Sequence, residues 1–131
     1  MADTGKHILV AEDEAAFRFS ASLALRMAGY RVTGAKDGMD ALEELIRLKE
    51  EGIQVDLLVT DLRMPNLSGA GLVAAMRRHD VLVPVFVVSG YIDPQVFEEL
   101  VLAGCVGHTE KPLLPDELVR CVERVMKKVA A

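Results

Sequence analysis

The chain has 131 residues, of which 51% are hydrophobic and 27% charged, and its formal net charge is −5. This length fits one domain that can fold without disulfides or a structural metal, and the acidic balance argues against direct nucleic-acid binding. The apolar runs are too short to cross a bilayer and the N-terminus lacks a signal-peptide pattern, so we expect a cytoplasmic protein that does not bind membranes.

Strand-like and helix-like segments alternate from the N-terminus onward. The short apolar run at 7–11 predicts a strand, and the segment after it has helical periodicity up to Gly29. We expect its buried face to consist of Phe17, Leu23, Ala24 and Met27. A weaker strand signal at 30–35 then precedes a helix that Asp37 is expected to cap.

The middle of the chain repeats this pattern twice. The apolar run at 55–60 predicts a third strand, followed by a helix that Ser68 can cap. The run at 83–89 predicts a fourth strand, and Asp93–Pro94 after it is a strong helix start. Apolar runs that are nearly continuous, rather than alternating, indicate strands covered on both faces of a parallel sheet.

A fifth strand at 105–108 and a last helix from Pro115 complete the order. Five strand–helix units with short connections predict an α/β fold, in which a parallel sheet has helices on both faces. The second and fifth strands, whose signals are weaker, are expected at the sheet edges. We expect one domain over 1–131 with a core at about 7–129.

Polar side chains follow four of the predicted strands. The first strand runs into Glu12–Asp13–Glu14, the third into Asp61 and the fourth into Ser89, while Lys111 follows the fifth. Ligands of such sheets bind outside the carboxyl ends of the strands, where the strand order reverses. We therefore expect these side chains to gather at one edge of the sheet.

Carboxylates held close together repel one another unless a cation lies among them. Magnesium suits such a cluster, so we predict a Mg²⁺ site at Glu12, Asp13 and Asp61. A cation there would let the Asp61 carboxylate attack an anionic phosphoryl group and form an aspartyl phosphate. Ser89 could then donate a hydrogen bond to the phosphoryl oxygens, and Lys111 could act as a point charge beside them.

Four segments carry a resemblance to a known family. Residues 8–14, 57–65 together with Gly69, 87–90 and 110–112 resemble, in this order, the motifs of the response-regulator receiver domain of chemotaxis-regulator type. The resemblance covers His7 to Val129. It implies a flavodoxin-like doubly wound sheet of five parallel strands, in the order 2-1-3-4-5, with five helices.

The resemblance also implies roles for residues at the site. Asp61 is similar to the phosphoacceptor, which takes its group from a sensor histidine kinase or a histidine phosphotransfer protein. Asp13 would bind magnesium directly, Glu12 would help, often through water, and the backbone carbonyl of Arg63 would supply another ligand. Arg63 and Tyr91 occupy the variable positions that tune the lifetime of the phosphoryl group in the family.

Ser89 resembles the family's switch hydroxyl, which moves to meet the phosphoryl group, and Lys111 would pair with the phosphoryl oxygens. Lys111–Pro112 is similar to the family's cis peptide. The sequence departs from the family at His108, where a Tyr or Phe usually stands three residues before the lysine. The resemblance implies a signalling switch rather than a conventional enzyme, acting as a monomer or weak dimer on a downstream protein.

Three other functions share part of this pattern. An FMN carrier would need a phosphate-binding loop where the acidic 12–14 segment stands. A phosphohydrolase with an aspartate nucleophile would need a second Asp at the position of Arg63. The third alternative, a receiver-like module that binds a protein constitutively, stays open because of His108.

Overall fold

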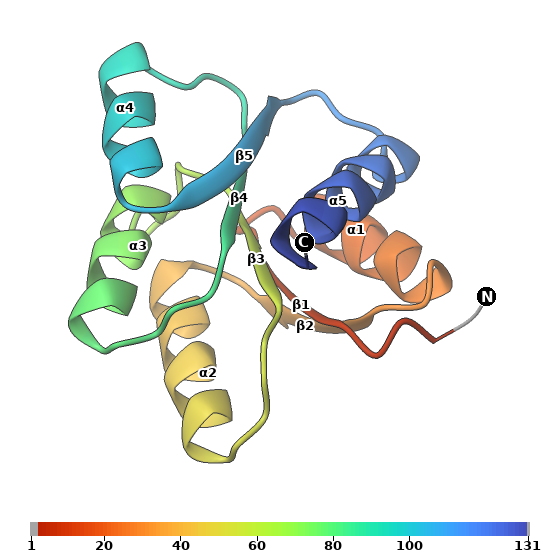
Figure 1. The fold of residues 1–131 in the computed structure, drawn as a ribbon. Helices are drawn as coiled ribbons and strands as arrows, with labels where there is room; N and C mark the ends of the chain where they lie inside the picture. The colour runs from red at the N-terminus through yellow and green to blue at the C-terminus, as the bar shows by residue number, and fades with distance from the viewer. Residues whose placement is uncertain (1–2, 131) are drawn as a thin grey trace.

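Five parallel strands form one sheet in the order β2-β1-β3-β4-β5 (Figure 1). The computed structural model describes residues 3–130. The strands are β1 (His7–Ala11), β2 (Arg31–Ala35), β3 (Leu57–Thr60), β4 (Val85–Ser89) and β5 (Cys105–Glu110). The helices are α1 (Ala15–Met27), α2 (Gly38–Glu50), α3 (Gly69–Arg78), α4 (Pro94–Leu102) and α5 (Pro115–Ala130). The expected flavodoxin-like fold is confirmed. The domain bounds 1–131 stay a prediction, since residues 1, 2 and 131 lie outside the described part.

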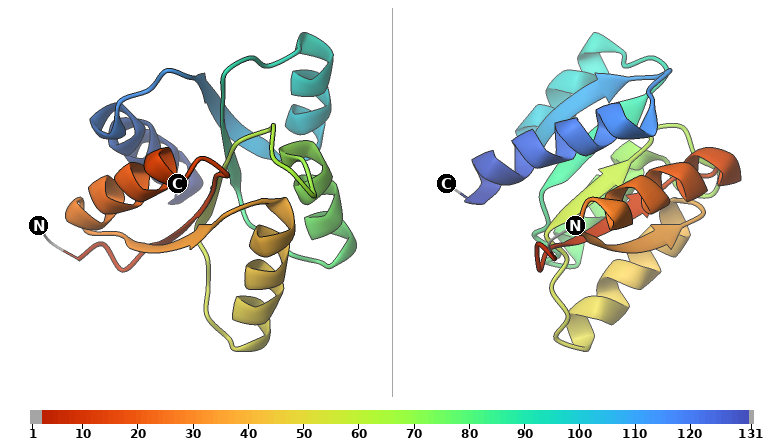
Figure 2. Two further views of the ribbon diagram at one scale, coloured as in Figure 1. Left: turned by 180° about the vertical axis from the view of Figure 1, so that it is seen from behind. Right: turned by 90° about the vertical axis from the view of Figure 1, so that its right-hand side faces the viewer.

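The helices cover the sheet on both faces. Helices α1 and α5 lie on one face, and α2, α3 and α4 lie on the other (Figure 2). Along β1, Ile8 and Val10 join the cluster under α1 and α5, whereas Leu9 and Ala11 join the other cluster. Successive side chains of a strand point to opposite faces, so a strand covered on both sides is apolar at every position.

The predicted buried face of α1 is wrong in part. Leu23 and Met27 are 46% and 65% exposed, whereas Ala21 and Leu25 are fully buried against the sheet and α5. Phe17, which belonged to the predicted face, is half-buried and packs against the same cluster. The helix has apolar side chains around most of its circumference, so hydrophobic periodicity alone cannot select the face that packs.

The predicted helix caps are confirmed. The Asp37 carboxylate accepts a hydrogen bond from Asp40 N at 2.8 Å, and Ser68 and Asp93 cap α3 and α4 in the same way. Asp37 also accepts a bond of 2.9 Å from the Asn66 side chain. Through this second bond the start of α2 holds the loop that leads from β3 into α3.

Candidate functional site

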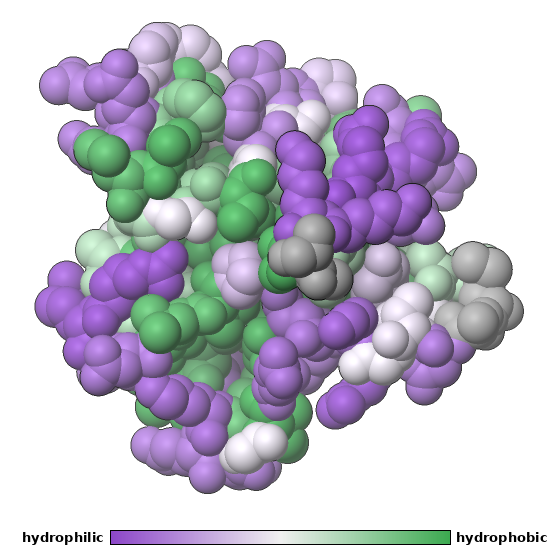
Figure 3. All heavy atoms as spheres, viewed as in Figure 1, coloured by the Kyte–Doolittle hydropathy of each residue, from purple (hydrophilic) through white to green (hydrophobic). Residues whose placement is uncertain are grey.

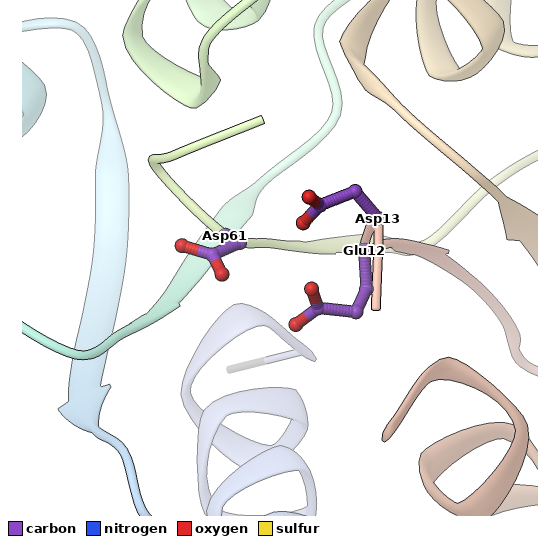
Figure 4. Close-up of side chains that lie close together, drawn as sticks. All are labelled: Glu12, Asp13 and Asp61. Carbon is purple, nitrogen blue, oxygen red and sulfur yellow. The ribbon is translucent and has the colours of Figure 1, made fainter. Parts of the chain in front are cut away.

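The polar residues that were predicted to gather do so at the carboxyl edge of the sheet. Glu12 and Asp13 follow β1, and their carboxylates point toward Asp61, which follows β3 (Figure 4). One carboxylate oxygen of each of the three residues lies within 4.8 Å of the others. Ladder hydrogen bonds fix these positions, since Asp61 N donates to Ala11 O at 3.1 Å.

Asp61 is nearly buried and accepts hydrogen bonds at both carboxylate oxygens. Its Oδ1 atom accepts from Arg63 N and from Ser89 Oγ, each at 3.1 Å. Its Oδ2 atom accepts from Lys111 Nζ at 2.9 Å. Donors from a loop, from the end of β4 and from the segment after β5 therefore fix the orientation of this carboxylate.

Lys111 joins Asp61 to Glu12. Its ammonium donates to Glu12 Oε1 at 2.5 Å as well as to Asp61. Burial raises the pKa of the Glu12 carboxyl, and the contact with Lys111 offsets part of that rise. Burial by itself would lower the pKa of Lys111, but its hydrogen bonds to the two carboxylates outweigh burial and raise it. The ammonium therefore stays charged between two carboxylates.

The acidic cluster fits a hard divalent cation. The single ammonium of Lys111 compensates only part of the charge of the three carboxylates, so a surplus of negative charge remains. All the donors are oxygen atoms, the ligands that magnesium prefers. Glu12 and Asp61 are buried whereas Asp13 is exposed, so the cluster has a side that faces solvent, where a cation could keep some of its waters.

Ser89 ends β4, and His108 lies on the neighbouring strand β5, where it pairs with Val87. Ser89 is fully buried and directed at Asp61, whereas His108 on β5 is exposed. The His108 ring meets the Phe97 ring of α4 edge to face, with centroids 4.5 Å apart. Arg63 and Tyr91 are both exposed beside the site. The peptide bond Lys111–Pro112 is cis, as the resemblance to the receiver family implied.

Two residues of α1 that the sequence did not assign to the site also lie there. The Phe17 ring lies under the Lys111 ammonium, with 4.8 Å between Nζ and the ring centroid. The Arg18 guanidinium donates to the carbonyl oxygen of Glu12 at 2.7 Å. Their position in the first turn of the helix after Glu12 is the one sequence signal that could have indicated these contacts.

Among the described residues, no helix combines the length and the apolar character needed to span a membrane.

Comparison with known proteins identifies the family. The model of the response regulator receiver domain matches residues 8–123. The chain is 31% identical over 125 residues to the transcriptional regulatory protein FixJ of Bradyrhizobium diazoefficiens, covering 95% of this chain and 58% of FixJ. It is also 31% identical over 121 residues to the sensor kinase CckA of Brucella abortus, covering 92% of this chain and 12% of CckA.

A solved receiver domain from Methanospirillum hungatei, described as CheY-like, has the same fold. It superposes with a TM-score of 0.83 at 22% identity, over 95% of this chain and 96% of that one. The chain thus spans somewhat more than half of FixJ and a small part of CckA, and in both relatives the match covers nearly all of this chain. The chain belongs to the family of response regulator receiver domains of two-component systems.

Proposed function

We propose that Asp61 accepts a phosphoryl group from a phosphohistidine on a sensor histidine kinase or a histidine phosphotransfer protein, and that this switches binding to a downstream protein. In this proposal 1–131 is a single cytoplasmic receiver domain. Glu12, Asp13, Asp61 and the backbone carbonyl of Arg63 would hold Mg²⁺. The observation that carries the proposal is the convergence of three carboxylates, Ser89 and Lys111 at one sheet edge.

Each residue has a distinct part in the transfer. A carboxylate oxygen of Asp61 attacks phosphorus, the new O–P bond forms as the N–P bond to the donor histidine breaks, and the released imidazole nitrogen takes up a proton. When bound, magnesium neutralises the carboxylates and the phosphoryl oxygens that would otherwise repel one another. Lys111 and Ser89 exchange their bonds to Asp61 for bonds to the phosphoryl oxygens.

This exchange supplies the switch. Ser89 leaves the Asp61 carboxylate for the phosphoryl group, and the neighbouring β4–β5 edge, where His108 contacts Phe97, repacks. The outer face of α4 and β5 includes the exposed apolar side chains of Val101, Leu102 and Val106, and Leu102 is 89% exposed. Apolar residues gather over α4 and β5 in Figure 3. We propose this face as the surface that binds the downstream protein.

Intact-mass spectrometry after incubation with acetyl phosphate tests the phosphoacceptor. We expect the wild type to gain one phosphoryl group only when magnesium is present, and Asp61→Asn to gain none. Asp80→Asn is the matched control, because Asp80 is an exposed aspartate with a φ of 55° that asparagine tolerates. A folded wild type that gains no phosphoryl group would contradict the proposal.

The constitutive binding module is the second candidate, which the histidine at position 108 left open at the level of the sequence. It predicts that Asp61→Asn binds the downstream protein as tightly as the phosphorylated wild type does. The phosphoacceptor proposal predicts that the phosphorylated wild type and Asp61→Asn differ in affinity. Titration of both forms against one partner separates the two candidates.

A further inference from the structure

The Lys111 ammonium has an aromatic neighbour besides its two carboxylates. It lies 4.8 Å from the centroid of the Phe17 ring, while it donates to Glu12 at 2.5 Å and to Asp61 at 2.9 Å. Phe17 itself is half-buried and packs against the apolar cluster between the sheet and helices α1 and α5. That packing limits the movement of the ring, so the ring forms a fixed surface under a flexible side chain.

We infer that Phe17 is a positioning residue for Lys111, whose ring face keeps the ammonium at the phosphorylation site while its hydrogen-bond partners change. The inference rests on the proposed function, in which Lys111 moves from Asp61 to the phosphoryl oxygens. A lysine ammonium is attracted to the face of an aromatic ring, and more strongly where the ammonium is partly shielded from water.

The form of this attraction suits a lysine that must move. A lysine has four rotatable bonds and three N–H donors, two of which already serve Glu12 and Asp61. The ring accepts the positive charge across its whole face, so it does not compete with a phosphoryl oxygen for one directed hydrogen bond. Phe17 therefore restricts where Lys111 can go without holding it in either of its two bonding arrangements.

The alternative is that Phe17 only fills space beside the core. The two explanations differ in which substitutions they tolerate. If the ring fills space, Phe17→Leu and Phe17→Met should be tolerated about as well as Phe17→Tyr. If the ring face attracts the ammonium, only an aromatic replacement should preserve the function. Phe19→Leu is the matched control, because Phe19 lies on the same helix and is 69% exposed.

The first measurement is the rate of phosphorylation by acetyl phosphate at saturating magnesium. We expect Phe17→Leu and Phe17→Met to be slower by roughly 3- to 10-fold, which corresponds to the usual strength of a cation–π contact. Phe17→Tyr should stay within about twofold of the wild type, and Phe19→Leu should equal it. Using both Leu and Met keeps the test valid if one of them folds poorly, which thermal unfolding would reveal.

The second measurement needs neither metal nor phosphoryl group. Protons on the Lys111 Cε carbon, which lie near the Phe17 ring face, should have NMR shifts moved upfield by the ring current in the wild type and in Phe17→Tyr. Phe17→Leu should lose this displacement, while Phe19→Leu should retain it. A wild-type Lys111 without the displacement would overturn the inference even if phosphorylation proceeds normally.

The outcomes separate this inference from the proposed function. If the wild type is phosphorylated and the Leu and Met variants react as fast, the inference fails and the proposed function stands. If Phe17→Tyr is as slow as Phe17→Leu, the shape of the phenyl ring matters rather than its electron density, and the inference also fails. If the wild type is never phosphorylated, the proposed function fails, and the NMR displacement still reports whether the ring positions Lys111.

Discussion

Lys111 lies between two buried carboxylates and offsets the electrostatic cost of burying both. Glu12 and Asp61 would repel each other without the ammonium, and Glu12 is almost fully shielded from water. Removing one partner of a buried ion pair is costly because the remaining charge stays buried without compensation. The side chain proposed to bind phosphoryl oxygens therefore also stabilises the site before a phosphoryl group arrives.

His7 should make stability depend on pH. It is buried at the start of β1, where Nε2 lies 2.7 Å from Thr33 Oγ1 and Nδ1 has no hydrogen-bond partner among the described residues. Burial, with help from the positive charge of Arg31, lowers the pKa of His7, although Asp56 acts in the opposite direction. As the pH is lowered past about 6.5, His7 takes up a proton in the unfolded chain before it does so in the folded one. The free energy of unfolding therefore decreases with falling pH, and it stops decreasing once the pH lies below the lowered pKa of the folded state.

Urea unfolding at about pH 7.5 and about pH 5.5 measures this loss. The loss should be smaller in His7→Val than in the wild type, because valine takes up no proton. His79→Asn, a change at an exposed histidine, should lose as much as the wild type. Equal losses in His7→Val and the wild type would show that His7 does not cause the dependence.

Gly69 leaves no space for a side chain beside Asp61. A Cβ there would lie 2.3 Å from the Asp61 carbonyl oxygen and 2.9 Å from Leu62 Cα. Gly69→Ala should therefore lower the free energy of unfolding by roughly 1–3 kcal/mol and slow the phosphorylation of Asp61. Gly34→Ala, whose Cβ would meet Arg18 at an ordinary 3.6 Å, is the control for urea unfolding. Similar stabilities of the two variants would contradict this account.

One arginine of α3 makes several hydrogen bonds at the end of helix α4. Arg77 of α3 donates to the carbonyl oxygen of Ala103, at the end of α4, from Nε at 3.0 Å and from Nη2 at 2.6 Å. Its Nη1 atom donates to Val81 O at 3.2 Å. Leu100 is the one residue of α4 that is fully packed into the core. The position of the helix therefore depends heavily on these hydrogen bonds.

Arg77→Ala should loosen α4 without unfolding the protein. Losing charged hydrogen bonds worth about 1.5–3 kcal/mol should speed amide hydrogen exchange in α4 by roughly tenfold or more. Arg78→Ala, a change at the exposed neighbouring residue, should leave exchange in α4 unchanged. If exchange in α4 is the same in both variants, Arg77 does not hold the helix.

Arg77 shows which contacts could not be predicted from the sequence. The strand ends could be predicted, because runs such as 57–59 are apolar throughout and lead into polar residues, here Thr60 and Asp61. The caps could be predicted too, because the Asp37 carboxylate accepts its hydrogen bond from Asp40 N, only three positions further along the chain. The bonds of Arg77 could not be predicted, since its partner Ala103 is 26 positions away and meets it only in the fold.

The candidate site, too, could be predicted only in part from the sequence. Its carboxylates, Ser89 and Lys111 could be predicted because parallel strands bring their carboxyl ends to one edge. The contact of Phe17 with Lys111 could not, because it depends on which face of α1 packs inward. His108 was expected at a switching position, and its edge contact with Phe97 depends on the docking of α4 against β5.

At the scale of the whole molecule, magnesium should stabilise the fold. A cation that binds the folded cluster and not the unfolded chain raises the free energy of unfolding, by about 1.4 kcal/mol at a tenfold excess over Kd. Thermal unfolding should therefore shift upward with magnesium and return with a chelator. Asp13→Asn should respond less, whereas Asp116→Asn, at an exposed residue in the first turn of α5, should respond like the wild type. No shift in the wild type would argue against the metal site.

The separation of 99 positions between Glu12 and Lys111 bears on how the protein is made. A ribosome adds about 5–20 residues per second, so the acidic residues of the site are synthesised several seconds before Lys111. During that interval the growing chain has the carboxylates without the ammonium that balances Glu12 and Asp61. Under the proposed function, an incomplete copy would lack the lysine that binds the phosphoryl oxygens, so a newly made molecule should accept a phosphoryl group only after the segment that follows β5 has joined the site.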